Sequence, residues 1–218
     1  MKQTLGLWAG LAVLLTAFPV SAEDKRPGAG PPSEQPASTL LEPAPPPSAL
    51  ADAVVLIIRH AEKPAQGRDL SAAGRRRAEA YVSYFEHFTI DGLPLKLDYL
   101  VATADSAGSD RPRQTLEPLS RALGLKINAP FASKQCGKLA EDLQSNSHGK
   151  LILIAWHHGQ IPALLTALGS DPRQLLPDGK WPEDEFSWVI QLRYDHQGRL
   201  IPTQARRINE GLMPGDAK

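Results

Sequence analysis

The sequence predicts an α/β protein: a three-layer α/β/α sandwich with a mostly parallel sheet and one antiparallel edge. Two long apolar runs, "AVVLIIR" and "KLILIAW", are typical of strands that helices cover on both faces. Segments with apolar residues at helical spacing separate the strands, and this alternation indicates a parallel sheet. Near the end of the chain two apolar segments flank the turn "DHQG", and such a hairpin would supply the antiparallel edge.

Local signals place the individual elements. Ser71 is a candidate cap for a helix over residues 71–88. A second helix should begin near Arg111, because the residue before a proline is usually extended, and should stop at Gly124. The other expected elements are strands at 53–59, 98–103, 125–130 and 150–156, helices at 136–144 and 160–169, and two strands within 186–208. The run Arg75–Arg77 is interpreted as a solvated helix face.

The chain divides into four predicted segments. Residues 1–22 are expected to be a signal peptide, because Lys2 precedes an apolar stretch too short to span a bilayer comfortably, and small residues precede a cleavage site after Ala22. An uncleaved anchor is the alternative. The other segments are a Pro- and Ala-rich linker (23–50), one domain (51–210) and a flexible tail (211–218). We therefore expect a periplasmic or secreted protein with no stable membrane anchor after processing.

The charge balance bears on possible partners, and the cysteine content bears on disulfide bonding. Lys plus Arg and Asp plus Glu number 24 each, so the charge balance provides no argument for a nucleic-acid partner, and none is expected. The single cysteine, Cys136, can form no internal disulfide. We expect it to be a small buried residue, with a reactive thiol as the alternative.

Cationic side chains gather at one predicted edge of the sheet. Arg59 and His60 end the first strand, Arg111 follows the second, and His157 and His158 end the buried strand "LILIAW". The carboxyl ends of parallel strands share one edge, where α/β proteins hold their sites. Successive strand residues point to opposite faces, so the two adjacent histidines are not expected to share a metal.

Such a cationic pocket suits a dianionic phosphoryl group. Arginine presents a planar fork of donors to phosphate oxygens, and a neutral histidine can attack phosphorus to form a phosphohistidine. A second, protonated histidine adds positive charge where negative charge develops. We therefore expect neither a metal nor another cofactor.

Four short motifs occur in order along residues 52–203: "LIIRHA", "LSAAG", "RPRQT" and "LILIAWHHG". Together they make the chain resemble the histidine phosphatase superfamily, which includes the phosphoglycerate mutases. The resemblance implies a phosphoglycerate mutase-like fold and His60 as the nucleophile. It also implies that Arg59 and Arg111 bind the phosphate and that His158, chosen because it directly precedes Gly159, completes the pocket.

Three features depart from the family pattern, and one of them is the loop "ADSAGSD", which is longer than the family's short turn at that place. Ala61 stands where the motif has glycine, and alanine adds a Cβ where a glycine backbone could approach a ligand closely. The general acid matches no motif, and the candidates are Glu62, Asp105 and Glu141.

The main hypothesis is a metal-independent phosphomonoester hydrolase that works through a phosphohistidine intermediate on His60. Export and the "RHAE" variant resemble periplasmic phosphatases of the lipopolysaccharide core, so the expected partner is a small phosphorylated substrate or a phosphorylated surface glycan. Two alternatives stay open: a non-catalytic binder of phosphorylated ligands, and a phosphotransferase or mutase. The oligomeric state has no signal in the sequence.

Overall fold

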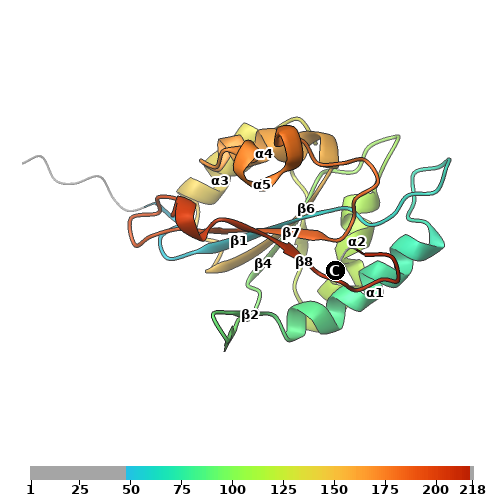
Figure 1. The fold of residues 1–218 in the computed structure, drawn as a ribbon, viewed down its shortest axis with the longest axis horizontal. Helices are drawn as coiled ribbons and strands as arrows, with labels where there is room; N and C mark the ends of the chain where they lie inside the picture. The colour runs from blue at the N-terminus through green and yellow to red at the C-terminus, as the bar shows by residue number, and fades with distance from the viewer. Residues whose placement is uncertain (1–47, 217–218) are drawn as a thin grey trace, which may run out of the picture. The chain divides into compact units, whose positions relative to one another are not determined.

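The computed structural model describes residues 48–216, which contain a six-stranded sheet between two layers of helices (Figure 1). The predicted signal peptide and nearly all of the predicted linker lie outside the described residues, so export stays a prediction. Within residues 48–216 no helix is both long and apolar enough to cross a membrane.

The main sheet has the strand order β5-β4-β6-β1-β7-β8. Four of its strands run parallel, whereas β7 is antiparallel to β1 and β8 is antiparallel to β7. The strands are β1 (Val54–Arg59), β4 (Tyr99–Ala102), β5 (Ile127–Asn128), β6 (Leu151–Trp156), β7 (Trp188–Arg193) and β8 (Arg206–Asn209). The parallel centre and the antiparallel edge confirm the predicted fold class.

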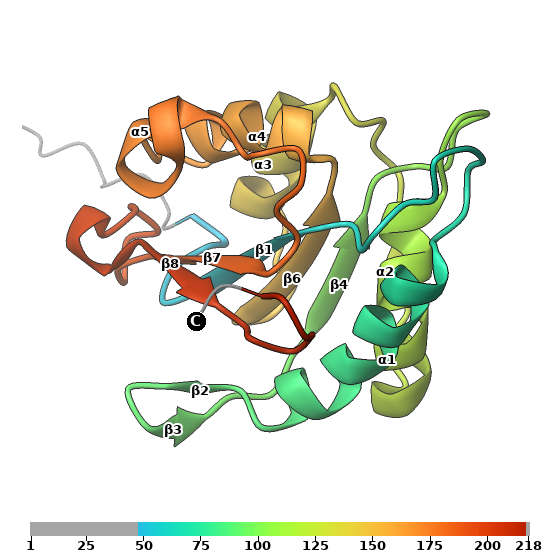
Figure 2. The same ribbon diagram turned by 45° about the vertical axis from the view of Figure 1, so that its right-hand side comes forward.

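Helices cover both faces of this sheet, as Figures 1 and 2 show. One layer contains α1 (Ala72–Glu86) and α2 (Arg111–Leu123). The other contains α3 (Cys136–Ser145), α4 (Ile161–Ala167) and the short α5 (Pro172–Leu175). The molecule is therefore the three-layer α/β/α sandwich that the sequence predicts.

The alternation of side chains along β1 explains why its sequence is apolar at every position. Val55 and Ile57 belong to the core beneath α3 and α4, whereas Leu56 and Ile58 belong to the core beneath α1 and α2. Successive strand residues point to opposite faces, so a strand covered twice needs apolar residues throughout. Cys136 is buried in the first of these cores, as expected.

The helix boundaries follow the predicted caps. Ser71 has an extended backbone, and its side chain accepts a hydrogen bond from the Gly74 N–H at 3.0 Å. α2 begins at Arg111 and ends at Gly124, whose φ of 67° is the left-handed conformation that glycine adopts most readily.

The region after β7 differs from the prediction. The turn "DHQG" is present, but the chain that follows it forms only an isolated β-bridge, between Leu200 and Tyr194 just beyond the end of β7. Pro202 lacks the N–H that a continuing ladder would require, and it begins a short 3-10 turn instead. β8 therefore starts only at Arg206.

A small hairpin and two boundary regions also differ from the prediction. β2 (Thr89–Ile90) and β3 (Leu93–Pro94) pair around Asp91 and Gly92, both of which have positive φ. Leu50, predicted to end the linker, is fully buried in the core. In the predicted flexible tail, the carboxylate of Asp216 forms an ion pair with Arg77.

Candidate active site

Two histidines from neighbouring strands form the centre of the candidate site. The parallel pairing of β1 with β6 aligns Arg59 with Trp156, so the next residues, His60 and His157, follow side by side. The His60 N–H donates to the Trp156 carbonyl at 2.9 Å, and the two imidazole rings meet edge to face with centroids 5.2 Å apart. The strand register therefore brings His157, and not its neighbour, against His60.

His158, which is predicted to complete the pocket, lies elsewhere. It begins the 3-10 turn His158–Gln160, where the chain leaves the strand direction. Its electrostatic neighbours are Arg59, Glu183 and Lys63. The motif order could not distinguish the two histidines, because only the pairing of β6 with β1 determines which of them faces His60.

A single hydrogen bond sets the tautomer of His60. Its Nδ1 lies 2.7 Å from the Ala61 carbonyl oxygen, which can only accept, so Nδ1 carries the proton. Nε2 is then left with its lone pair. This is the arrangement that a nucleophilic imidazole needs.

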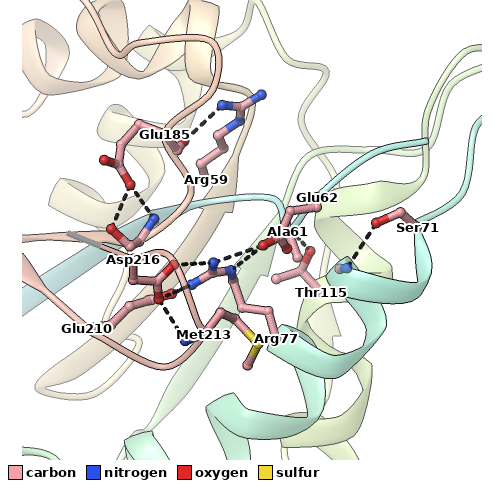
Figure 3. Close-up of polar contacts among 12 residues, drawn as sticks. Arg59, Ala61, Glu62, Ser71, Arg77, Thr115, Glu185, Glu210, Met213 and Asp216 are labelled. Carbon is pink, nitrogen blue, oxygen red and sulfur yellow. Dashed lines mark hydrogen bonds and ion pairs between the residues drawn. The ribbon is translucent and has the colours of Figure 1, made fainter. Parts of the chain in front are cut away.

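Arg59 is fully buried and has one edge without a partner. Its Nη1 donates to three backbone carbonyls of the loop after Trp181, those of Pro182, Glu183 and Glu185. Figure 3 shows the contact with Glu185. The Phe186 ring stacks on its guanidinium at 3.8 Å. By contrast, Nε and Nη2 are buried with no hydrogen-bond partner among the described residues. These two atoms form one donor edge of the guanidinium, which an anion with two oxygens could accept.

Arg111 supplies a second cation at the start of α2. Its Nη1 donates to the Gly67 carbonyl at 3.0 Å, while its buried Nε has no partner among the described residues. Thr115, one turn along α2, accepts a hydrogen bond from the Ala61 N–H at 2.9 Å. Of the described non-glycine residues only Asp52, Asp91 and Asp178 have positive φ, so Ala61 occupies a backbone conformation that does not require glycine.

The pKa values of both central histidines are depressed. Burial lowers the pKa of His60 to about 3, and the charge of Arg59 acts in the same direction. Burial likewise lowers the pKa of His157 to about 4, and here the charge of Arg111 makes the largest cationic contribution. Without a bound anion, both imidazoles are therefore neutral at physiological pH.

This depression predicts an acid-sensitive stability. An unfolded histidine titrates near 6.5, so the unfolded chain takes up the His60 proton before the folded protein does. The free energy of unfolding should therefore fall as the pH drops from 6.5 towards 3, by about 1 kcal/mol per pH unit for this group. Urea unfolding of the natural protein and of His60→Gln at pH 7 and pH 5 measures the effect. The stability difference between the two proteins should shift in favour of the variant at pH 5; an unchanged difference would show that His60 titrates normally.

Comparison with known proteins identifies the fold. The sequence matches no protein-family model and no curated protein. A candidate alpha-ribazole-5'-P phosphatase from Escherichia coli K-12 aligns over 74% of this chain and 98% of its own, with a TM-score of 0.53 and 14% identity. The protein histidine phosphatase SixA, solved with tungstate, covers 72% of this chain and 97% of its own (TM-score 0.49, 18% identity). A phosphoglycerate mutase from Plasmodium falciparum covers 76% and 96% (TM-score 0.48, 13% identity).

This chain has the fold of that candidate phosphatase, which is the phosphoglycerate mutase-like fold that the sequence predicts. One of the motifs behind the predicted resemblance, "LSAAG", has a clear structural role in it. The Ser71 N–H donates to the Glu62 carbonyl at 2.9 Å, and a Cβ on Gly74 would overlap that same oxygen. The glycine thus allows the start of α1 to pack directly against the loop that follows His60.

A cluster of buried charges fixes the same loop. Arg77 is 2% exposed and donates to Glu62 from Nε at 3.0 Å and from Nη2 at 2.8 Å. Its guanidinium also binds Glu210 and both oxygens of Asp216 (Figure 3). We call these four residues the Arg77 cluster. The interpretation of Arg75–Arg77 as a solvated helix face is wrong for Arg77, which points inward and joins α1 to the end of the chain.

The three candidate general acids lie apart from one another in the structure. Glu62 is bound by Arg77, and Asp105 accepts from Arg113 Nε at 2.9 Å. Glu141 is exposed on α3, in the helix layer on the other face of the sheet. Glu141 is therefore remote from the histidine pair, and the other two are each held by an arginine.

No group of three or more His, Cys, Asp or Glu side chains between residues 48 and 216 is arranged to hold a metal ion. Metal independence nevertheless stays a prediction, to be tested by activity in the presence of a chelator.

Proposed function

We propose that the protein is a metal-independent phosphomonoester hydrolase that forms a phosphohistidine on His60. The observation that carries the proposal is the unpaired edge of Arg59. A fully buried guanidinium with two orphan donors is costly unless an anion binds there. Beside it lies a neutral imidazole whose Nε2 can attack. A phosphoryl group satisfies both features.

The reaction would proceed in two displacements. His60 Nε2 forms a bond to phosphorus as the bond to the ester oxygen breaks, and the leaving alcohol takes up a proton. Water then attacks the phosphohistidine and releases inorganic phosphate, which regenerates the neutral imidazole. Arg59 and Arg111 would bind the phosphoryl oxygens, where charge accumulates during both transfers.

The geometry supports His157 in place of His158 as the second histidine. A phosphate dianion beside His60 would raise the depressed pKa of His157, and a protonated His157 would then donate to a phosphoryl oxygen. His157→Ala should therefore slow aryl phosphate turnover by about 10²-fold or more, whereas the matched variant His158→Ala should have a much smaller effect. Steady-state kinetics of both variants decide the assignment, and the reverse order of effects would restore His158.

An aryl phosphate tests the activity itself, because its good leaving group needs little help from a general acid. We expect stoichiometric release of inorganic phosphate in the presence of a chelator. Saturable binding without turnover would support the non-catalytic binder, and transfer of phosphate to an added acceptor in place of release would support the phosphotransferase or mutase. A small phosphorylated substrate or a phosphorylated surface glycan, met after export, remains the proposed natural ligand.

A further inference from the structure

A cavity of about 780 Å³ adjoins the candidate active site and has no role in the two displacements described above. Its walls are the start of α1, the loop after Trp181 and the last described segment of the chain. Its lining includes Glu62, Arg76, Arg77, Asp184, Phe186 and Met213. We call this cavity the C-terminal pocket.

A continuous series of contacts joins the walls of this pocket to Arg59. Arg59 donates to the Glu185 carbonyl at 2.9 Å, and the Glu185 carboxylate accepts from the N–H and the hydroxyl of Ser187, both at 2.6 Å. The Glu210 N–H donates to the Ser187 carbonyl at 2.8 Å, and the Glu210 side chain binds Arg77. The pocket is thus built into the same framework as the site.

The pocket also lies within reach of the reacting atoms. Phe186 lines it, stacks on Arg59, and has its ring centroid 6.4 Å from that of His60. Glu62, on another wall, is two residues after His60. A group attached to a phosphate at His60 could extend past Phe186 into this space, whose volume suits a small-molecule site.

The lining of the pocket carries a surplus of negative charge. It contains four carboxylates and two guanidinium groups. Arg77 is neutralised by its own carboxylate partners, whereas the Glu185 carboxylate binds the uncharged donors of Ser187. Asp184 is exposed on the same loop. An ammonium group would be attracted into such a pocket, and a second anionic group would be repelled.

We infer that the C-terminal pocket holds the leaving group of the substrate and favours one that carries a positively charged amine. The natural substrate is then a zwitterionic phosphomonoester, such as a phosphorylated amino alcohol or amino sugar, with its phosphate at His60 and its ammonium in the pocket. The inference rests on the proposed phosphatase function and adds the chemical class of the substrate to it.

Three phosphomonoesters of equal chain length test the inference: phosphoethanolamine, ethyl phosphate and phosphoglycolate. They differ in carrying an ammonium, no charge or a carboxylate on the leaving group. Their inhibition constants against aryl phosphate hydrolysis should rank in that order, with steps of about fivefold. Asp184→Asn should bring the constants of phosphoethanolamine and ethyl phosphate closer together. The control Glu86→Gln changes an exposed carboxylate at the far end of α1 and should preserve the ratio.

The outcomes separate the two proposals. Aryl phosphate turnover with no preference for the ammonium compound, or with a preference that Asp184→Asn leaves unchanged, overturns the inference and leaves the phosphatase intact. Absence of aryl phosphate turnover overturns the proposed function, and the inference falls with it.

Discussion

His60→Ala is expected to abolish both aryl phosphate turnover and formation of a covalent phosphoenzyme. His60 supplies the attacking Nε2, and its orientation depends on the Nδ1 bond to the Ala61 carbonyl and on the backbone bond to Trp156. Alanine retains the phosphate-binding cations but provides no atom to accept the phosphoryl group. Turnover should fall by roughly 10⁴-fold or more, the scale seen when a covalent nucleophile is removed.

The covalent species is trapped by brief mixing with labelled substrate followed by alkaline denaturation, because acid destroys a phosphohistidine. In the natural protein the label should map to His60. His87→Ala, which changes an exposed histidine at the end of α1, should retain both label and turnover. A label on serine or aspartate, or ordinary turnover by His60→Ala, would contradict the mechanism.

Arg77→Met is expected to cause the largest loss of stability among single substitutions near the site. The side chains of Glu62, Glu210 and Asp216 are only 20%, 0% and 7% exposed, and Arg77 is their shared partner. Methionine fills most of the volume but leaves buried carboxylates without a counter-charge. Removing one partner of a buried ion pair costs roughly 3–5 kcal/mol, so the midpoint of urea unfolding should fall markedly.

Arg76→Met is the matched control for Arg77→Met. Arg76 is the preceding residue of the same helix but is exposed, so its replacement should change the unfolding free energy by less than about 0.5 kcal/mol. In the Arg77→Met background, Asp216→Asn should recover part of the loss, because it removes a buried carboxylate that has lost its counter-charge. Equal stability of the two arginine variants would show that the Arg77 cluster is energetically unimportant.

Much of the fold could be predicted because its signals are local. Because β1 is covered on both faces, its sequence is an unbroken apolar run. Ser71 marks the start of α1, and Gly124 marks the end of α2. Each signal depends on residues within a turn or two of one another, so no tertiary information is needed. The predicted position of the last strand is wrong, because the turn signal at "DHQG" does not indicate where the chain pairs with β7 again after Pro202.

The candidate site was only partly predictable. Arg59, His60 and Arg111 are predictable because each lies at or just after the end of a strand that is evident in the sequence. An open α/β sheet holds its sites at the carboxyl ends of its strands. The sequence could not correctly distinguish His157 from His158. The motif, in which the histidine directly precedes a glycine, favours His158, but His157 is the residue that faces His60. The sequence of residues 211–218, predicted to be a flexible tail, likewise contains no signal for the ion pair between Asp216 and Arg77.

The sequence by itself determined the layers, the order of the elements and the edge of the sheet at which the cations collect, because hydrophobic period and capping act over a few residues. The tertiary structure alone decided which histidine meets His60, which arginine is buried, and that residues 213–216 form a wall of a pocket. Each of these depends on the register or packing of segments far apart in the chain; the pairing of Arg59 with Trp156, for example, is what places His157 beside His60.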